Sequence, residues 1–145
     1  MKLIKNLIGG LVGAVALNIL HESMKRLDHD APRIDLVGEE ALSRSITGLG
    51  GEPPEGDALF AATLAGDLVS NALYYSLIGI GKKKNLLWRG AGYGLAAGIG
   101  ALTLTKPMGL RDAPITKTQK TKVMTVTWYL FGGLVSALTI RGLRR

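Results

Sequence analysis

The stretch Arg89-Gly-Ala-Gly-Tyr-Gly-Leu-Ala-Ala-Gly-Ile-Gly-Ala-Leu-Thr-Leu104 decides the fold, because it is apolar and has very little side-chain bulk. At roughly 100° per residue, an α-helix places its small residues in two ridges on opposite faces. The ridges are Gly90, Gly94 and Gly98 on one side, and Gly92, Ala96 and Gly100 on the other. In lipid, such ridges let neighbouring helix backbones approach closely. The stretch therefore predicts a transmembrane helix over 86–104 that packs on more than one side.

The composition agrees with membrane helices and excludes several other classes of protein. Glycine accounts for 20 of the 145 residues, with only 5 prolines, and 47% of the chain is hydrophobic. The net charge is +7, but the basic residues flank apolar runs instead of interleaving with aromatic residues, so nucleic-acid binding is not expected. The absence of cysteine excludes disulfides and cysteine-based metal sites. No cofactor motif is present, so no cofactor is expected.

On the N-terminal side of this helix, a short basic turn joins it to a second apolar segment. Residues 58–81 are long enough to span a membrane, and only Lys82-Lys-Lys-Asn85 separates them from the glycine-rich helix. So short a link predicts an antiparallel hairpin. Lys82, Lys83 and Lys84 would lie at the membrane surface, where they either attract anionic lipid headgroups or fix the topology.

Two further apolar segments complete a predicted all-α bundle of four transmembrane helices in a single domain, 1–145. Residues 123–140 form the last span, and residues 3–20 form the first. The first segment has an alternative interpretation as a secretory signal cut after Ala16. Lysines and arginines number nine at each end of such a bundle. The basic residues closest to the ends of the spans count most toward the cytoplasmic side, and they favour an orientation with both termini in the cytoplasm.

The polar connection 21–57 carries nine of the eleven acidic residues. Asp35 is a reasonable helix N-cap, and Leu42, Ile46 and Leu49 then recur at helical spacing. This pattern predicts a short amphipathic helix in the first loop. The helix would lie on the membrane surface or cap the bundle. The Asp-Ala-Pro sequence at 30–32 is repeated at 112–114, which suggests either a duplicated hairpin or a chance match.

Asp67 is the residue most suggestive of function, because a carboxyl within a membrane helix is costly unless it is paired, protonated or hydrated. Asn71 lies one helical turn further on. Other polar residues predicted at the same membrane depth are Asn18, His21, Glu22 and Thr127, and Tyr93 either adds a hydroxyl or faces an interface. These residues would either line a polar cavity or form a clamp in which Asp67 is protonated or bonded to Asn18 or Thr127.

The sequence around His21 does not predict a metal site. A zinc-binding His-Glu-x-x-His motif would need histidine at position 25, where the chain has lysine. A solvated helix end is the expectation for His21 and Glu22.

His21-Glu22 through Asp30-Ala-Pro-Arg-Ile-Asp35, together with Trp128-Tyr-Leu-Phe-Gly-Gly133, resembles small multi-pass bacterial membrane proteins of no assigned activity. The resemblance implies a bacterial inner membrane and assigns no residue a role. The function expected is therefore a structural or interaction component, with no enzymatic activity. If one glycine ridge of 86–104 meets another copy, the protein self-associates, and if both ridges meet the other spans, it is a monomeric bundle. Gly9 and Gly13 of the first span are predicted as a packing partner for either ridge. The alternatives are a conduit for ions, protons or solutes at Asp67 and Asn71, and a lipid-modifying enzyme using His21, Glu22 and Asp67.

Overall fold

The computed structural model describes all residues, 1–145, and the protein is entirely α-helical, with no β-strand. Its six α-helices are α1 (Lys2–Leu27), α2 (Ile34–Gly48), α3 (Gly56–Ser76), α4 (Leu86–Leu104), α5 (Ala113–Thr116) and α6 (Gln119–Leu143). Two short 3-10 turns, η1 (Leu77–Gly79) and η2 (Lys83–Asn85), lie between α3 and α4.

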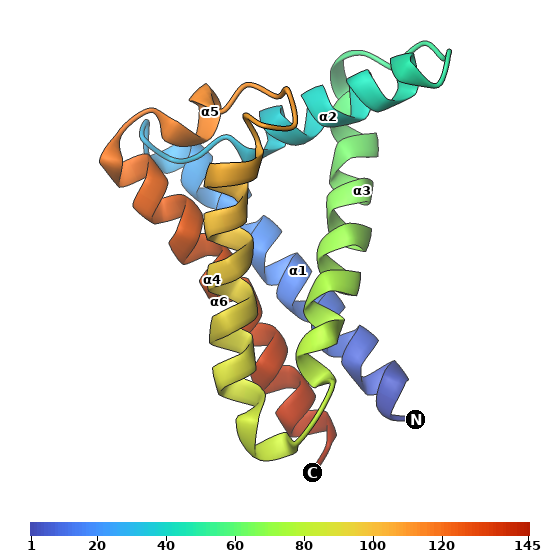
Figure 1. The fold of residues 1–145 in the computed structure, drawn as a ribbon, viewed down its shortest axis with the longest axis vertical. Coiled ribbons are helices and arrows are strands. Elements are labelled where there is room, and N and C mark those ends of the chain that lie inside the picture. Colours follow the sequence, from blue (N-terminus) through green and yellow to red (C-terminus); the bar gives the residue numbers. More distant parts are fainter.

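The four long helices run between two ends of the molecule (Figure 1). Both termini and the turn at Lys82–Lys84 lie at one end, and α2 and α5 lie at the other, so these are called the terminal end and the loop end. Helix α1 crosses the molecule diagonally and packs against both α3 and α6, while α4 packs mainly against α6. Although α3 and α4 are antiparallel neighbours in sequence, they diverge from their turn and scarcely touch.

Glycines form the contacts between the long helices. Gly94 of α4 lies against the backbone of Tyr129 and Leu130 in α6. The rest of that ridge behaves in the same way, since Gly90 faces Gly133 and Ala137, and Gly98 faces Val126. On α1, Gly9 and Gly13 also lie against α6, while Gly10 lies against α3. The first span thus presents its glycines to the last span and to α3, and not to α4.

The second predicted ridge of α4 has no partner within the chain. Gly92 has open space where a Cβ would project, and Gly100 has only Leu104 of its own helix within 4 Å. Ala96, between them, is exposed. We call Gly92, Ala96 and Gly100 the outer ridge of α4.

Two of the four predicted spans, α1 and α6, are long and apolar enough to cross a membrane by length and composition. Helices α3 and α4 do not meet the same criterion. Asp67 and Asn71 lower the apolar character of α3, while Arg89 and the many glycines lower that of α4. By hydropathy alone, only the first and last spans are supported.

Helix α2 occupies the predicted first loop, but its details differ from those expected. It begins at Ile34, with Arg33 in the N-cap position, so the prediction of Asp35 as the N-cap is wrong. Leu49 follows the helix and is 89% exposed, so it does not extend an apolar face. The two Asp-Ala-Pro segments, 30–32 and 112–114, lie close together. The N–H of Arg33, the residue after the first segment, donates a hydrogen bond of 3.0 Å to the Pro114 carbonyl.

Candidate functional site

A cluster of charged side chains lies at the loop end, where α1 meets the start of α2. We call His21, Glu22, Lys25, Arg33 and Asp35 the polar cluster. Arg33 donates two hydrogen bonds to the Asp35 carboxylate, from Nε to Oδ1 at 2.9 Å and from Nη2 to Oδ2 at 2.8 Å. Lys25 joins the two helices, since its Nζ lies 2.8 Å from Glu22 and 3.3 Å from Asp35. These bonds fix the start of α2 against the end of α1.

Asp35 is the centre of the polar cluster, and its side chain is only 7% exposed. Burial alone would raise the pKa of this carboxyl. The hydrogen bonds from Arg33 and the charges of Arg33 and Lys25 outweigh burial and lower the pKa to about 2. Asp35 is therefore ionised at neutral pH, and it serves as the counter-ion for both cations.

His21 faces Asp35 from α1, but without a hydrogen bond. Its Nε2 lies 3.5 Å from Asp35 Oδ1, is buried, and has no hydrogen-bond partner. Because Gly9 and Gly13 contact Ile140 and Ser136, the antiparallel register places His21 level with Trp128 of α6. The Trp128 indole Nε1 is likewise buried without a partner. One buried nitrogen on α1 and one on α6 therefore have no hydrogen-bond partner within the protein.

Asp67 lies on α3 where α2 crosses that helix. A Cβ added at Gly38 of α2 would lie 2.8 Å from the Thr63 Cγ2, and 3.7 Å and 3.9 Å from the two Asp67 carboxylate oxygens, so the glycine lets α2 lie close to α3 beside this carboxyl. Asp67 is half-buried and forms no side-chain hydrogen bond or salt bridge. The carboxyl therefore remains available to a proton, a cation or water.

The clamp proposed from the sequence does not form. Asn18 instead donates through Nδ2 to the Ala14 carbonyl of its own helix, at 3.0 Å. Thr127 donates to the Val123 carbonyl at 2.7 Å and is exposed, so it faces outward. Asn71 is half-buried. The sequence of a helix does not show which of its hydroxyls points inward when its neighbouring helices are unknown. The buried threonines of α6 are Thr121 and Thr125, not Thr127.

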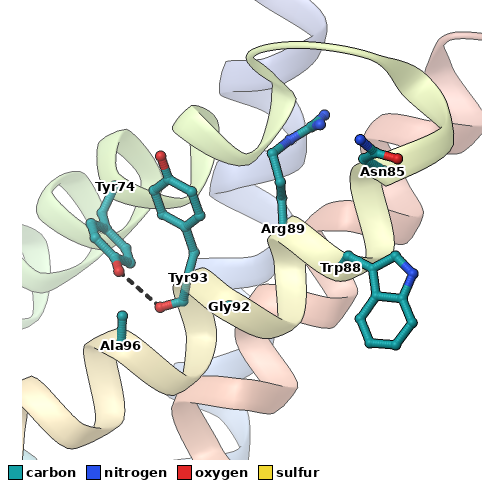
Figure 2. A pocket seen from close by; sticks show the side chains of 7 residues that line it. All are labelled: Tyr74, Asn85, Trp88, Arg89, Gly92, Tyr93 and Ala96. Carbon is teal, nitrogen blue, oxygen red and sulfur yellow. Dashed lines mark hydrogen bonds between the residues drawn. The ribbon is translucent and has the colours of Figure 1, made fainter.

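Tyr93 belongs to a different part of the molecule, a groove of about 690 Å³ between the end of α3 and the start of α4 (Figure 2). Its ring packs on that of Tyr74 with centroids 5.4 Å apart, and the Tyr74 hydroxyl donates to the Tyr93 carbonyl at 2.8 Å. Arg89, also in the groove, donates to the Ile78 carbonyl at 2.7 Å. Its guanidinium therefore holds η1, the turn that follows α3, in place.

Of the predicted polar residues, His21 and Glu22 both belong to the polar cluster, which includes Asp35 at the start of α2. Asp67 lies beside Gly38, also on α2. Lys25 and Arg33, which the sequence interpretation omitted, provide the positive charges of the polar cluster. The sequence feature that could have identified Lys25 and Arg33 is their positive charge, since both lie in the acidic connection 21–57.

Comparison with known proteins found no matching family model, no matching curated protein and no matching solved structure.

Proposed function

We propose that this protein is a four-span component of a bacterial inner membrane, with cytoplasmic termini, which acts by structural interaction and associates with copies of itself. In this proposal α1, α3, α4 and α6 all span the bilayer. The outer ridge of α4 is the contact between copies. Lys82, Lys83 and Lys84 meet anionic lipid headgroups.

The observation that carries the membrane assignment is the distribution of large apolar side chains. They are exposed along one stripe of α1 for almost its whole length: Leu3, Ile4, Ile8, Leu11, Val12, Val15 and Ile19. Outward-facing apolar residues also occur on α3 (Val69, Leu73), α4 (Leu95, Ile99) and α6 (Phe131, Leu138). Soluble monomers seldom expose apolar surface on this scale. Inside the bundle, helices meet through glycine, as is usual for helices in lipid.

Self-association is supported by the unequal use of the two ridges of α4. Gly90, Gly94 and Gly98 lie against α6, whereas Gly92 faces open space and Gly100 has only Leu104 of its own helix within 4 Å. An uncovered ridge of small residues on a membrane helix gives a second helix a surface for close backbone contact. A symmetric dimer would place Ala96, at the centre of the ridge, beside its own copy.

The absence of cysteine gives a direct test. We expect Ala96→Cys to form a disulfide-linked dimer in native membranes under mild oxidation, because two facing cysteines can form a disulfide when their Cα atoms lie within about 7 Å. Gly66→Cys is the matched control, since Gly66 is also exposed and open but lies on α3. Gly92→Leu added to Ala96→Cys should abolish the crosslink. Equal crosslinking at positions 66 and 96 would reject the outer ridge as the contact.

A second candidate function, a small conduit for protons or cations, is favoured by the unpaired carboxyl of Asp67. In a membrane such a group is expected to be paired unless it serves transport or faces water. Proteoliposomes with an imposed pH gradient would then show flux that Asp67→Asn abolishes without loss of helical content. Absence of flux in the unaltered protein would reject this function.

A further inference from the structure

Charge is distributed very unequally between the two ends of the molecule. The terminal end holds nine of the eighteen basic residues: Lys2, Lys5, Lys82, Lys83, Lys84, Arg89, Arg141, Arg144 and Arg145. All eleven acidic residues lie within 22–67 or at position 112, which belong to the other end or to the middle of α3. The side chains of the terminal end therefore carry a formal charge of +9, with no acidic side chain among them.

Part of this positive charge converges on one cleft. A cleft of about 550 Å³ is lined by Lys2 and Lys5 of α1, Lys82 and Lys83 of the turn before α4, and Arg144 near the end of α6. These five cations come from three segments that are far apart in sequence. None of them forms a salt bridge. The volume falls within the range of small-ligand sites.

Arg144 is held at the edge of the cleft by neutral groups alone. Its Nη2 donates to the Asn6 side-chain oxygen and to the Gly79 carbonyl, and its Nε is buried without a partner. Its carbonyl accepts a hydrogen bond of 3.2 Å from Lys83. The guanidinium is thus fixed in place with its charge uncompensated, which is how a preorganised anion site is arranged.

We infer that this cleft binds a phosphate group, and that the phosphate belongs to the headgroup of an anionic phospholipid. Five cations repel one another unless an anion lies among them, and phosphate oxygens accept hydrogen bonds from both lysine and arginine. The lipid assignment rests on the proposed membrane location, which brings the terminal end to the level of the headgroups. Lys84 does not line the cleft. The site therefore differs from a simple basic turn.

The test compares two double variants that remove equal charge from the same end. Native mass spectrometry of the detergent-solubilised protein would measure retention of phosphatidylglycerol and of phosphatidylcholine. We expect preferential retention of phosphatidylglycerol, with an affinity lowered at least about tenfold by Lys2→Gln with Lys5→Gln. Arg141→Gln with Arg145→Gln, at two exposed basic residues that do not line the cleft, should lower it less than about threefold. Lys82→Gln with Lys83→Gln provides a second cleft variant, and circular dichroism checks that every variant is folded.

Equal losses in the cleft and control variants would show diffuse attraction and overturn the site. Inorganic pyrophosphate separates the two sources of phosphate. If pyrophosphate binds while phosphatidylglycerol is retained no better than phosphatidylcholine, the lipid assignment is overturned. If neither binds, the site itself is overturned. The Ala96→Cys crosslink reports self-association separately, because that residue lies outside the cleft.

Discussion

Gly94→Ala tests whether the inner glycine ridge of α4 sets the distance between α4 and α6. A Cβ at this position would lie 2.7 Å from both the Leu130 Cα and the Tyr129 carbonyl oxygen, and 3.2 Å from the Leu130 nitrogen. All three atoms belong to the backbone, so no side-chain rotation relieves the overlap. Carbon atoms prefer separations of about 3.5 to 4.0 Å, so the helices would have to separate by about 1 Å. Overpacking of this kind costs about 1–3 kcal/mol.

Gly92→Ala is the matched control, because it makes the same chemical change two residues away, where no atom lies within 4 Å. Reversible unfolding in mixed micelles, followed by circular dichroism, would give both free energies of unfolding. We expect Gly94→Ala to lose about 2 kcal/mol, while Gly92→Ala stays within about 0.5 kcal/mol or gains slightly from the better helix propensity of alanine. Equal stability of the two variants would refute the close approach of α4 and α6.

Three further predictions concern the loop end and the core. The folded-state pKa of Asp35 is about 2, below its ordinary 3.8, so its ionised form contributes about 2 kcal/mol to the free energy of unfolding above pH 4, and this contribution is lost as the pH falls through 2. The free energy of unfolding measured from pH 6 to pH 2 should show this loss, and Asp35→Asn should flatten the pH dependence. Thr118→Ala removes the N-cap of α6, in which Thr118 Oγ1 accepts a hydrogen bond from the Thr121 N–H at 3.1 Å. The variant should lower the free energy of unfolding by about 1 kcal/mol, whereas Lys117→Ala, at the exposed neighbouring residue, should leave it unchanged. Tyr75→Phe deletes the fully buried hydroxyl that donates to the Tyr129 carbonyl at 2.8 Å. The free energy of unfolding should fall by about 1 kcal/mol, and an unchanged free energy would argue that the hydrogen bond is absent.

The glycine-rich helix could be located from sequence because its pattern is local. Residues 86–104 are helical as predicted, and the sequence defined both ridges from helical spacing alone. The sequence could not decide which ridge is covered, because that depends on α6, whose Gly133 lies against Gly90 and Gly94 only after the chain has folded. The short link before α4 predicted an antiparallel neighbour, yet it does not require the two helices to pack along their length.

The polar residues were harder to place, because each has more than one partner within reach. Asp35 was expected to cap a helix, but two hydrogen bonds from Arg33 are stronger than one from a backbone amide. Asn18 and Thr127 satisfy their side chains within their own helices, so their position in sequence carried no information about Asp67. Arg89 likewise donates to backbone carbonyls, those of Ile78 and Lys82 in the link between α3 and α4, and sequence spacing alone does not indicate these acceptors.

The pairing of α4 with α6 also has a consequence for biosynthesis. Helix α4 scarcely touches α3, which precedes it, and packs mainly on the last long helix of the chain. About 40 residues separate the ends of α4 and α6. At a synthesis rate of about 5–20 residues per second, roughly 2 to 8 s pass before the partner emerges. During that interval α1 and α3 can already associate, while the glycine surface of α4 stays uncovered. In the membrane location proposed above, that surface would be open to any neighbouring helix, including the α6 of another nascent copy.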